Sequence, residues 1–135
     1  MKSKHCHPIR VYYEDTDLAG IVYYANYLKF IERGRSEWVR EMGIDQSEMR
    51  EAFGIVFAVR RIEADYLKPA KFDDDLIVST ALVKQSAARI VLEQQVLRGD
   101  EVLFFSIVKL VCLKNDGSPA RVPQAFRDAA EEMAK

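Results

Sequence analysis

One long amphipathic segment limits the folds that are open to this chain. Between Asn26 and Met42, apolar side chains recur at the three- and four-residue spacing of a helix with one buried face. These positions are Tyr27, Phe30, Ile31, Gly34, Trp38 and Met42. Gly43 is suited to a C-terminal cap, so we predict a helix over 26–42. Gly34 costs this helix about 1 kcal/mol relative to alanine. Its place on the apolar face predicts close approach to a sheet.

Most of the remaining chain has the pattern of strands. A short strand is predicted over 9–13, where apolar residues alternate with Arg10 and Tyr12, and a loop over 14–23. After a polar connector, four more runs are strand-like: 54–67, 75–84, 88–98 and 101–113. Pro123 opens a C-terminal helix over 123–135. This order indicates an α+β fold in which an antiparallel sheet of about five strands packs on one long helix.

Length and composition favour a single cytoplasmic domain. A chain of 135 residues with an apolar fraction of 49% has enough material for one core, so we take 1–135 as one domain with a flexible tail over 1–7. No apolar run reaches the roughly 18–20 residues of a membrane span. The N-terminus also lacks the apolar stretch of a signal peptide. The net charge of −1 argues against nucleic acid as a partner.

The residues most suggestive of chemistry directly precede the long helix. Asp15 and Asp17 lie two residues apart in a turn, and Gly20 and a short apolar run follow. This layout places a carboxylate, which is a base or a nucleophile, beside the unpaired N–H groups of a helix start. Asp17 is the candidate catalytic residue, and the alternative is an aspartate that only caps a turn. For Asp15 we expect hydrogen bonds that hold the loop, rather than like-charge repulsion that raises the pKa of Asp17.

Three motifs are similar to one known family over roughly residues 8–123. They resemble hotdog-fold acyl-CoA thioesterases of the 4-hydroxybenzoyl-CoA thioesterase group, and most closely the branch encoded beside the Tol-Pal cell-envelope genes. The motifs are Asp15-Thr16-Asp17-x-x-Gly20-Ile21-Val22-Tyr23-Tyr24-x-Asn26-Tyr27, Glu32-Arg33-x-Arg35-x-Glu37 and Asp65-Tyr66-x-x-Pro69-Ala70-x-x-Asp73-Asp74.

The resemblance implies a fold, an assembly and two catalytic groups. The sheet would wrap the helix, and copies of the chain would join sheet edges as dimers or tetramers. Asp17 falls on the family's catalytic aspartate, either as base for a hydrolytic water or as nucleophile. The backbone N–H of Tyr24 would polarise the thioester carbonyl. Many Tol-Pal-type relatives have histidine at this point, so the tyrosine here leaves only the backbone role in place.

The same resemblance suggests how substrate is held. Ile21, Val22 and Tyr23 would shape the pocket for the acyl group, whether a short chain or an aryl group. Among the basic residues of the sheet region, Arg61 and Arg89 are the first choices for the phosphates of coenzyme A. The other basic residues weighed are Arg60, Lys68 and Lys84.

No metal or other cofactor is expected. His5-Cys6-His7 has ligand-like residues, but it lies at a terminus without a matching cluster elsewhere. Cys112 lies in an apolar strand and is expected to be a core residue.

The sequence therefore predicts an acyl-CoA thioesterase. The rival from another class is a non-catalytic acyl-thioester-binding or scaffold protein of the cell-envelope machinery.

Overall fold

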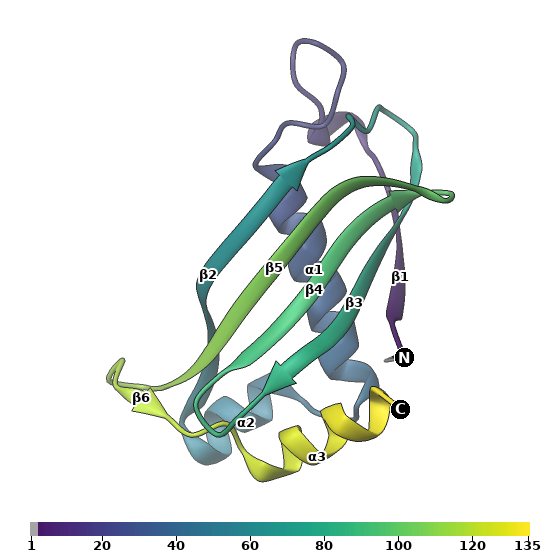
Figure 1. Ribbon diagram of the computed structural model, residues 1–135. Helices are drawn as coiled ribbons and strands as arrows, with labels where there is room; N and C mark the ends of the chain where they lie inside the picture. The colour runs from purple at the N-terminus through teal and green to yellow at the C-terminus, as the bar shows by residue number, and fades with distance from the viewer. Residues whose placement is uncertain (1–2) are drawn as a thin grey trace.

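A computed structural model describes residues 3–135 as one antiparallel sheet with three α-helices (Figure 1). The strand order is β1-β3-β4-β5-β2, and the short β6 pairs with β5. In chain order the elements are β1 His5–Arg10, the 3-10 turn η1 Tyr13–Asp15, α1 Asn26–Glu41, α2 Gln46–Phe53, β2 Ile55–Tyr66, β3 Asp75–Gln85, β4 Ile90–Arg98, β5 Glu101–Lys114, β6 Pro119–Ala120 and α3 Gln124–Met133.

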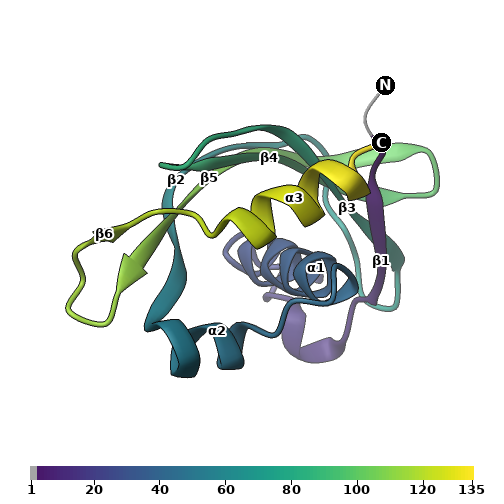
Figure 2. The ribbon, with the colours of Figure 1, turned by 90° about the horizontal axis from the view of Figure 1, so that it is seen from below.

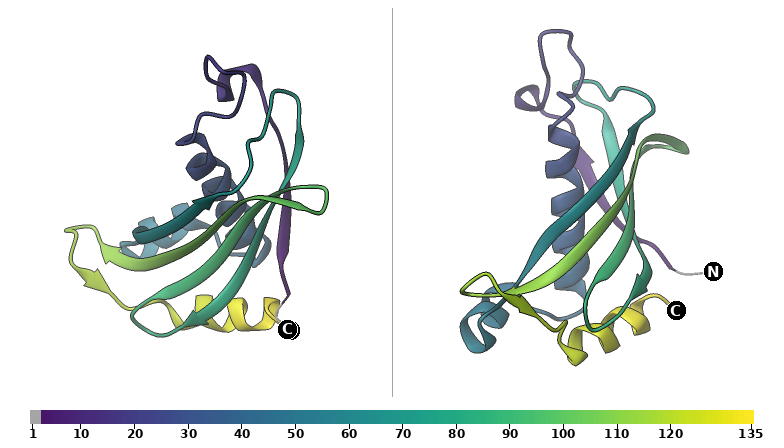
Figure 3. Two further views of the ribbon diagram at one scale, coloured as in Figure 1. Left: turned by 45° about the horizontal axis from the view of Figure 1, so that its top comes forward. Right: turned by 60° about the vertical axis from the view of Figure 1, so that its left-hand side comes forward.

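The sheet curves around α1, which is seen end-on in Figure 2. Phe30 and Ile31 of α1 are fully buried against the inner face of the sheet, where Leu92 and Phe104 are also fully buried. At the far end of α1, α3 lies under the sheet (Figure 3), and the ring of Phe126 contacts that of Trp38 at 5.9 Å between centroids. This arrangement confirms the α+β hotdog fold.

α1 lies very close to the sheet at Gly34. A Cβ atom placed on Gly34 would lie 2.4 Å from Cγ1 of Val78 in β3. The buried side chain of Gln94 joins the two layers beside it, since its Nε2 donates to the carbonyl of Ile31 at 2.9 Å. Its Oε1 accepts from Arg35 at 2.9 Å. The predicted reason for a glycine on this helix face is confirmed.

The predicted polar connector is wrong, because much of it forms α2. Asp45 caps this helix by accepting hydrogen bonds from the N–H groups of Ser47 and Glu48. Gly54 ends it with a left-handed φ of 65°. The capping signals are present in the sequence, but the helix has a single buried residue, Met49, and so it lacks the apolar stripe that identifies helices.

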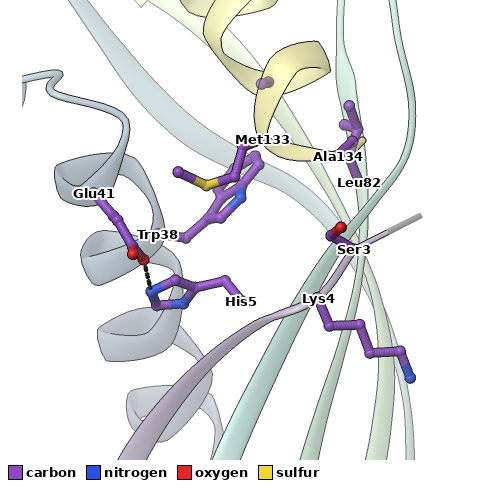
Figure 4. Close-up of a pocket in the computed structure, with 9 residues that line it drawn as sticks. Ser3, Lys4, His5, Trp38, Glu41, Leu82, Met133 and Ala134 are labelled. Carbon is purple, nitrogen blue, oxygen red and sulfur yellow. Dashed lines mark ion pairs between the residues drawn. The ribbon is translucent and has the colours of Figure 1, made fainter.

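The chain start also differs from the prediction. The first strand ends at Arg10 because the chain then turns, and the carboxylate of Asp15 accepts the N–H of Tyr12 at 2.8 Å. The predicted tail over 1–7 is wrong for 5–7, which pair with β3, while residues 1–2 lie outside the described part. Nε2 of His5 lies 2.7 Å from Glu41 of α1, beside a small cavity of about 140 Å³ (Figure 4).

The other predicted elements match within a few residues. The helix over 26–42, the four later strands and the C-terminal helix correspond to α1, β2 to β5 and α3. Gly99 takes a left-handed φ of 61° in the predicted turn between β4 and β5. Within residues 3–135, no helix is long and apolar enough to cross a membrane.

The contact at Gly34 predicts whether replacing this glycine stabilises or destabilises the fold. Helix propensity alone would make Gly34→Ala stabilising by about 1 kcal/mol. We expect instead a loss of about 1–3 kcal/mol in the free energy of unfolding, because the methyl group overlaps Val78. Urea denaturation measures this. The double variant Gly34→Ala/Val78→Ala should be less destabilised than the sum of its two single changes, and additive or stabilising results would contradict the overlap.

Candidate active site

A short hairpin stands above the N-terminal end of α1 and carries Asp17 (Figures 1 and 3). Thr16 and Val22 form an antiparallel bridge, and the N–H of Asp17 donates to the carbonyl of Ile21 at 2.9 Å. Gly20 has a φ of 79°, which lets the chain reverse within so few residues. The tight turn therefore holds Asp17 next to the start of the helix.

The hairpin is anchored on the loop between β2 and β3. The N–H of Val22 donates to the carbonyl of Ala70 at 2.9 Å, and Ile21 forms an antiparallel bridge with Lys71. This loop is tied in turn to the turn between β4 and β5, where Arg98 lies 2.7 Å from Glu101 and 2.8 Å from Asp74. Hydrogen bonds to Glu101 and then Asp74 raise the pKa of Arg98, so its charge is retained.

Asp15 holds the loop from inside, as predicted. Its side chain is buried and accepts the N–H of Tyr12. Its backbone carbonyl accepts from the N–H of Tyr23 and from Nδ2 of Asn26, both at 2.9 Å. Asn26 is buried as the first residue of α1, so these bonds fix the entry into the helix. Asp15 is thus committed to structure, whereas Asp17 is exposed.

The carboxylate of Asp17 is only partly engaged. Its Oδ1 accepts the N–H of Ala19 at 2.9 Å, which is the turn-capping bond weighed as the alternative role. Its Oδ2 has no hydrogen-bond partner among residues 3–135. A side-chain hydrogen bond with Tyr24 is the main cause that raises the pKa of the neighbouring Tyr23, and the negative charge of Asp17 is a smaller cause. The rings of Tyr23 and Tyr24 lie 4.9 Å apart between centroids.

Tyr24 lies two residues before α1 begins, with its ring exposed. Its backbone N–H donates no hydrogen bond within the described part of the chain. The carbonyl of Tyr23, at the other end of the same peptide group, accepts the N–H of Asn26 at 2.8 Å. The N–H of Tyr24 is thus an available donor next to a helix start, where anions are favoured.

Two neighbours of this donor differ from what the sequence suggested. Val22 is only 3% exposed, so it can shape a pocket only from beneath, unlike the half-buried Ile21 and the exposed Tyr23. Tyr66 belongs to one of the three family motifs, but no role was predicted for it. Its hydroxyl donates to the carbonyl of Tyr24 at 3.1 Å, across 42 residues of sequence. Only its position at the end of a strand hinted at this contact.

Arg61 and Arg89 meet at one groove of about 310 Å³, on the face of the sheet away from α1. Arg60, Lys109 and Val111 complete its lining. A β-bulge between Val59 and Arg61 brings both neighbouring arginines to the groove. Lys109 was missed, although it is the single lysine within the apolar run of β5. Arg61 also pairs with Glu63 at 2.9 Å.

The remaining candidates have ordinary roles. Cys112 is buried, and burial raises the pKa of its thiol to about 11, so it is a core residue as predicted. Lys68 pairs with Glu101 at 2.7 Å, away from the groove. Among residues 3–135, no group of three or more histidine, cysteine, aspartate or glutamate residues is arranged to hold a metal ion.

Comparisons with known proteins agree with this architecture. "Acyl-CoA thioesterase YbgC" of Haemophilus influenzae is 39% identical over 124 residues, which cover 88% of this chain and 91% of that protein. "Acyl-CoA thioester hydrolase YbgC" of Escherichia coli is 36% identical over 107 residues, covering 78% and 79%. A crystal structure of a probable thioesterase from Bartonella henselae matches with a TM-score of 0.87 at 35% identity, covering 90% of this chain and all of that one.

Family membership follows from a match over most of the chain. Residues 11–130 match the family described as the Thioesterase-like superfamily. This range contains the Asp17 hairpin, α1 and all of the sheet except β1. The chain belongs to the Thioesterase-like superfamily and is a thioester hydrolase.

Proposed function

We propose that the protein hydrolyses acyl-CoA thioesters to a free acid and coenzyme A, without a metal or other cofactor. One observation carries the proposal: the partly free carboxylate of Asp17 lies on a hairpin whose second arm leads directly to the available N–H of Tyr24. The names of the relatives from Haemophilus influenzae and Escherichia coli support coenzyme A as the thiol. The motif residues from Asp15 to Tyr27 support a place in the 4-hydroxybenzoyl-CoA thioesterase group and its Tol-Pal-associated branch.

In this proposal Asp17 and Tyr24 have separate roles in the reaction. The carboxylate of Asp17 either removes a proton from water or attacks the thioester carbonyl itself. The carbonyl oxygen gains negative charge, and the N–H of Tyr24 stabilises it. The C–S bond then breaks, and the sulfur leaves as the thiol of coenzyme A with one proton of the water. The hydroxyl of that water completes the acid, either directly or by hydrolysing the anhydride that Asp17 has formed. Ile21 and Tyr23 face the acyl group, which is a short chain or an aryl group, and Val22 supports them from beneath.

The groove between β2 and β5 is the proposed seat of the coenzyme A phosphates. Arg61 and Arg89 line it together with Arg60 and Lys109, so four cations surround one hollow. Guanidinium groups match phosphate oxygens in geometry and charge. A net charge of −1 for the whole chain makes such a local cluster notable, since the surrounding surface carries no general excess of positive charge.

The exposed edge of the sheet supports a homo-oligomer, either a dimer or a tetramer. β2 is 12 residues long and pairs with β5 on one side, and within the described part of the chain no strand pairs with its other side. A long unpaired edge is a template for pairing with another copy. The groove begins on the same strand, so a partner joined there would lie next to it. Sedimentation velocity tests this proposal, and a fully active monomer would refute it.

The decisive test of function is Asp17→Asn. The amide keeps the size of the side chain and removes the base or nucleophile, so turnover of acyl-CoA should fall by about 10²-fold or more. Release of coenzyme A, followed with a thiol reagent, measures turnover. Asp100→Asn, an exposed aspartate in the turn between β4 and β5, is the matched control and should be unaffected. Near-normal turnover in a folded Asp17→Asn protein would refute the catalytic role of Asp17. Absence of turnover by the unaltered protein on every acyl-CoA would instead favour the rival, a non-catalytic acyl-thioester-binding protein.

The groove makes a separate prediction about KM. Arg61→Ala and Arg89→Ala should each raise KM for an acyl-CoA by roughly tenfold, the effect of one charge-assisted hydrogen bond. The same variants should hydrolyse the N-acetylcysteamine thioester normally, because it lacks the phosphates. Lys84→Ala, an exposed cation of β3 outside this groove, serves as control. An equal rise in KM for both substrates would show that the groove does not bind the nucleotide.

A further inference from the structure

Tyr66 connects the edge strand β2 to the start of α1. Its ring lies against Phe104 at 5.0 Å and Tyr27 at 5.5 Å between centroids, both at steep angles. It also meets the ring of Tyr24 edge-on at 6.2 Å. Edge-to-face contacts of this kind are favourable and directional. The ring of Tyr66 is therefore held in one orientation, although it is 49% exposed.

The hydroxyl of Tyr66 is directed at the backbone of Tyr24. It donates to the Tyr24 carbonyl at 3.1 Å. Burial is the main cause that raises the pKa of Tyr66, so the hydroxyl keeps its proton and remains a donor. α1 begins only at Asn26, so this carbonyl lies ahead of the helix. A side chain from a distant strand thus supplies its partner.

These contacts hold both peptide groups that flank the Cα of Tyr24. The group before it carries the Tyr24 N–H, and its carbonyl, that of Tyr23, accepts from Asn26 at 2.8 Å. The group after it is held by Tyr66 at 3.1 Å. Because peptide groups are planar, only the φ and ψ of Tyr24 relate one to the other. Holding both planes therefore fixes the direction in which the Tyr24 N–H points.

We propose that Tyr66 is a positioning residue, whose hydroxyl aims the N–H of Tyr24 at the carbonyl oxygen of the bound thioester. This inference rests on the proposed role of Tyr24 as the oxyanion donor. A donor that is fixed before the reaction stabilises developing charge far better than one that must reorient. Tyr66 touches neither the thioester nor Asp17 in this role, so its effect falls on the chemical step and not on binding.

The central variant is Tyr66→Phe, which removes one oxygen and keeps the ring against Phe104 and Tyr27. We expect kcat to fall by about tenfold, with KM and the melting temperature nearly unchanged, because a small misalignment slows the chemical step. Tyr13→Phe is the matched control. Its ring contacts Phe72 at 6.1 Å, and its hydroxyl makes no hydrogen bond among residues 3–135, so its kcat should stay normal.

A spectroscopic measurement separates aiming from other roles. The backbone amide resonance of Tyr24 should shift in Tyr66→Phe and stay in place in Tyr13→Phe. Loss of kcat without that shift, or a rise in KM instead of a fall in kcat, would overturn the inference. So would an unchanged kcat.

Tyr24→Pro distinguishes failure of this inference from failure of the proposed function. It removes the N–H donor at a position close to the helix start, where proline is tolerated. If this variant loses about 10²–10³-fold in kcat while Tyr66→Phe is normal, the oxyanion role stands and the role of Tyr66 is refuted. If folded Tyr24→Pro is fully active, the oxyanion role fails, and the inference fails with it.

Discussion

The contact between α1 and the sheet at Gly34 aligns the helix whose first turn borders the candidate active site. A side chain there would meet Val78, so only a glycine lets the helix lie this close. The buried amide of Gln94 fixes the same contact by bonding to both Ile31 and Arg35. Buried polar groups of this kind are costly unless satisfied, so they favour a single alignment of helix and sheet. That alignment determines the position of the first turn of α1, and with it the place where a substrate could bind.

At that end, backbone bonds do most of the positioning. Asp15 and Asn26 close the entry into the helix, and Ala70 accepts the N–H of Val22 from the other side. Tyr27 adds a bond of its own, because its hydroxyl accepts the N–H of Ala70 at 3.0 Å. The hairpin of Asp17 is therefore supported at its base from two directions, while its tip stays in solvent. In the role proposed for Asp17, a carboxylate on a rigid base combines access to substrate with a defined approach.

Local pattern was enough to predict α1 and four of the strands, because each buries a face with clear periodicity. It failed for α2, which is held by its caps at Asp45 and Gly54 more than by an apolar stripe. The first strand was misplaced because Asp15 turns the chain by a side-chain bond that periodicity does not reveal. Asp17 and Tyr24 could be proposed as site residues because both lie in the motif from Asp15 to Tyr27. The contact of Tyr66 with Tyr24 depends on tertiary structure, because the two residues are 42 positions apart and no short stretch of sequence contains both.

The bulge in β2 has a consequence beyond its two arginines. Before it, odd-numbered residues such as Ile55 and Phe57 pack toward the core, and after it the even-numbered Ile62 does so. One extra residue thus reverses the phase of the strand, and this reversal is what turns Tyr66 inward. If Arg60 paired in step with Lys109 and no bulge formed, Asp65 would lie opposite Phe104 and Tyr66 would point outward. The bulge therefore decides which side chain of β2 reaches the start of α1, six residues away from the bulge itself.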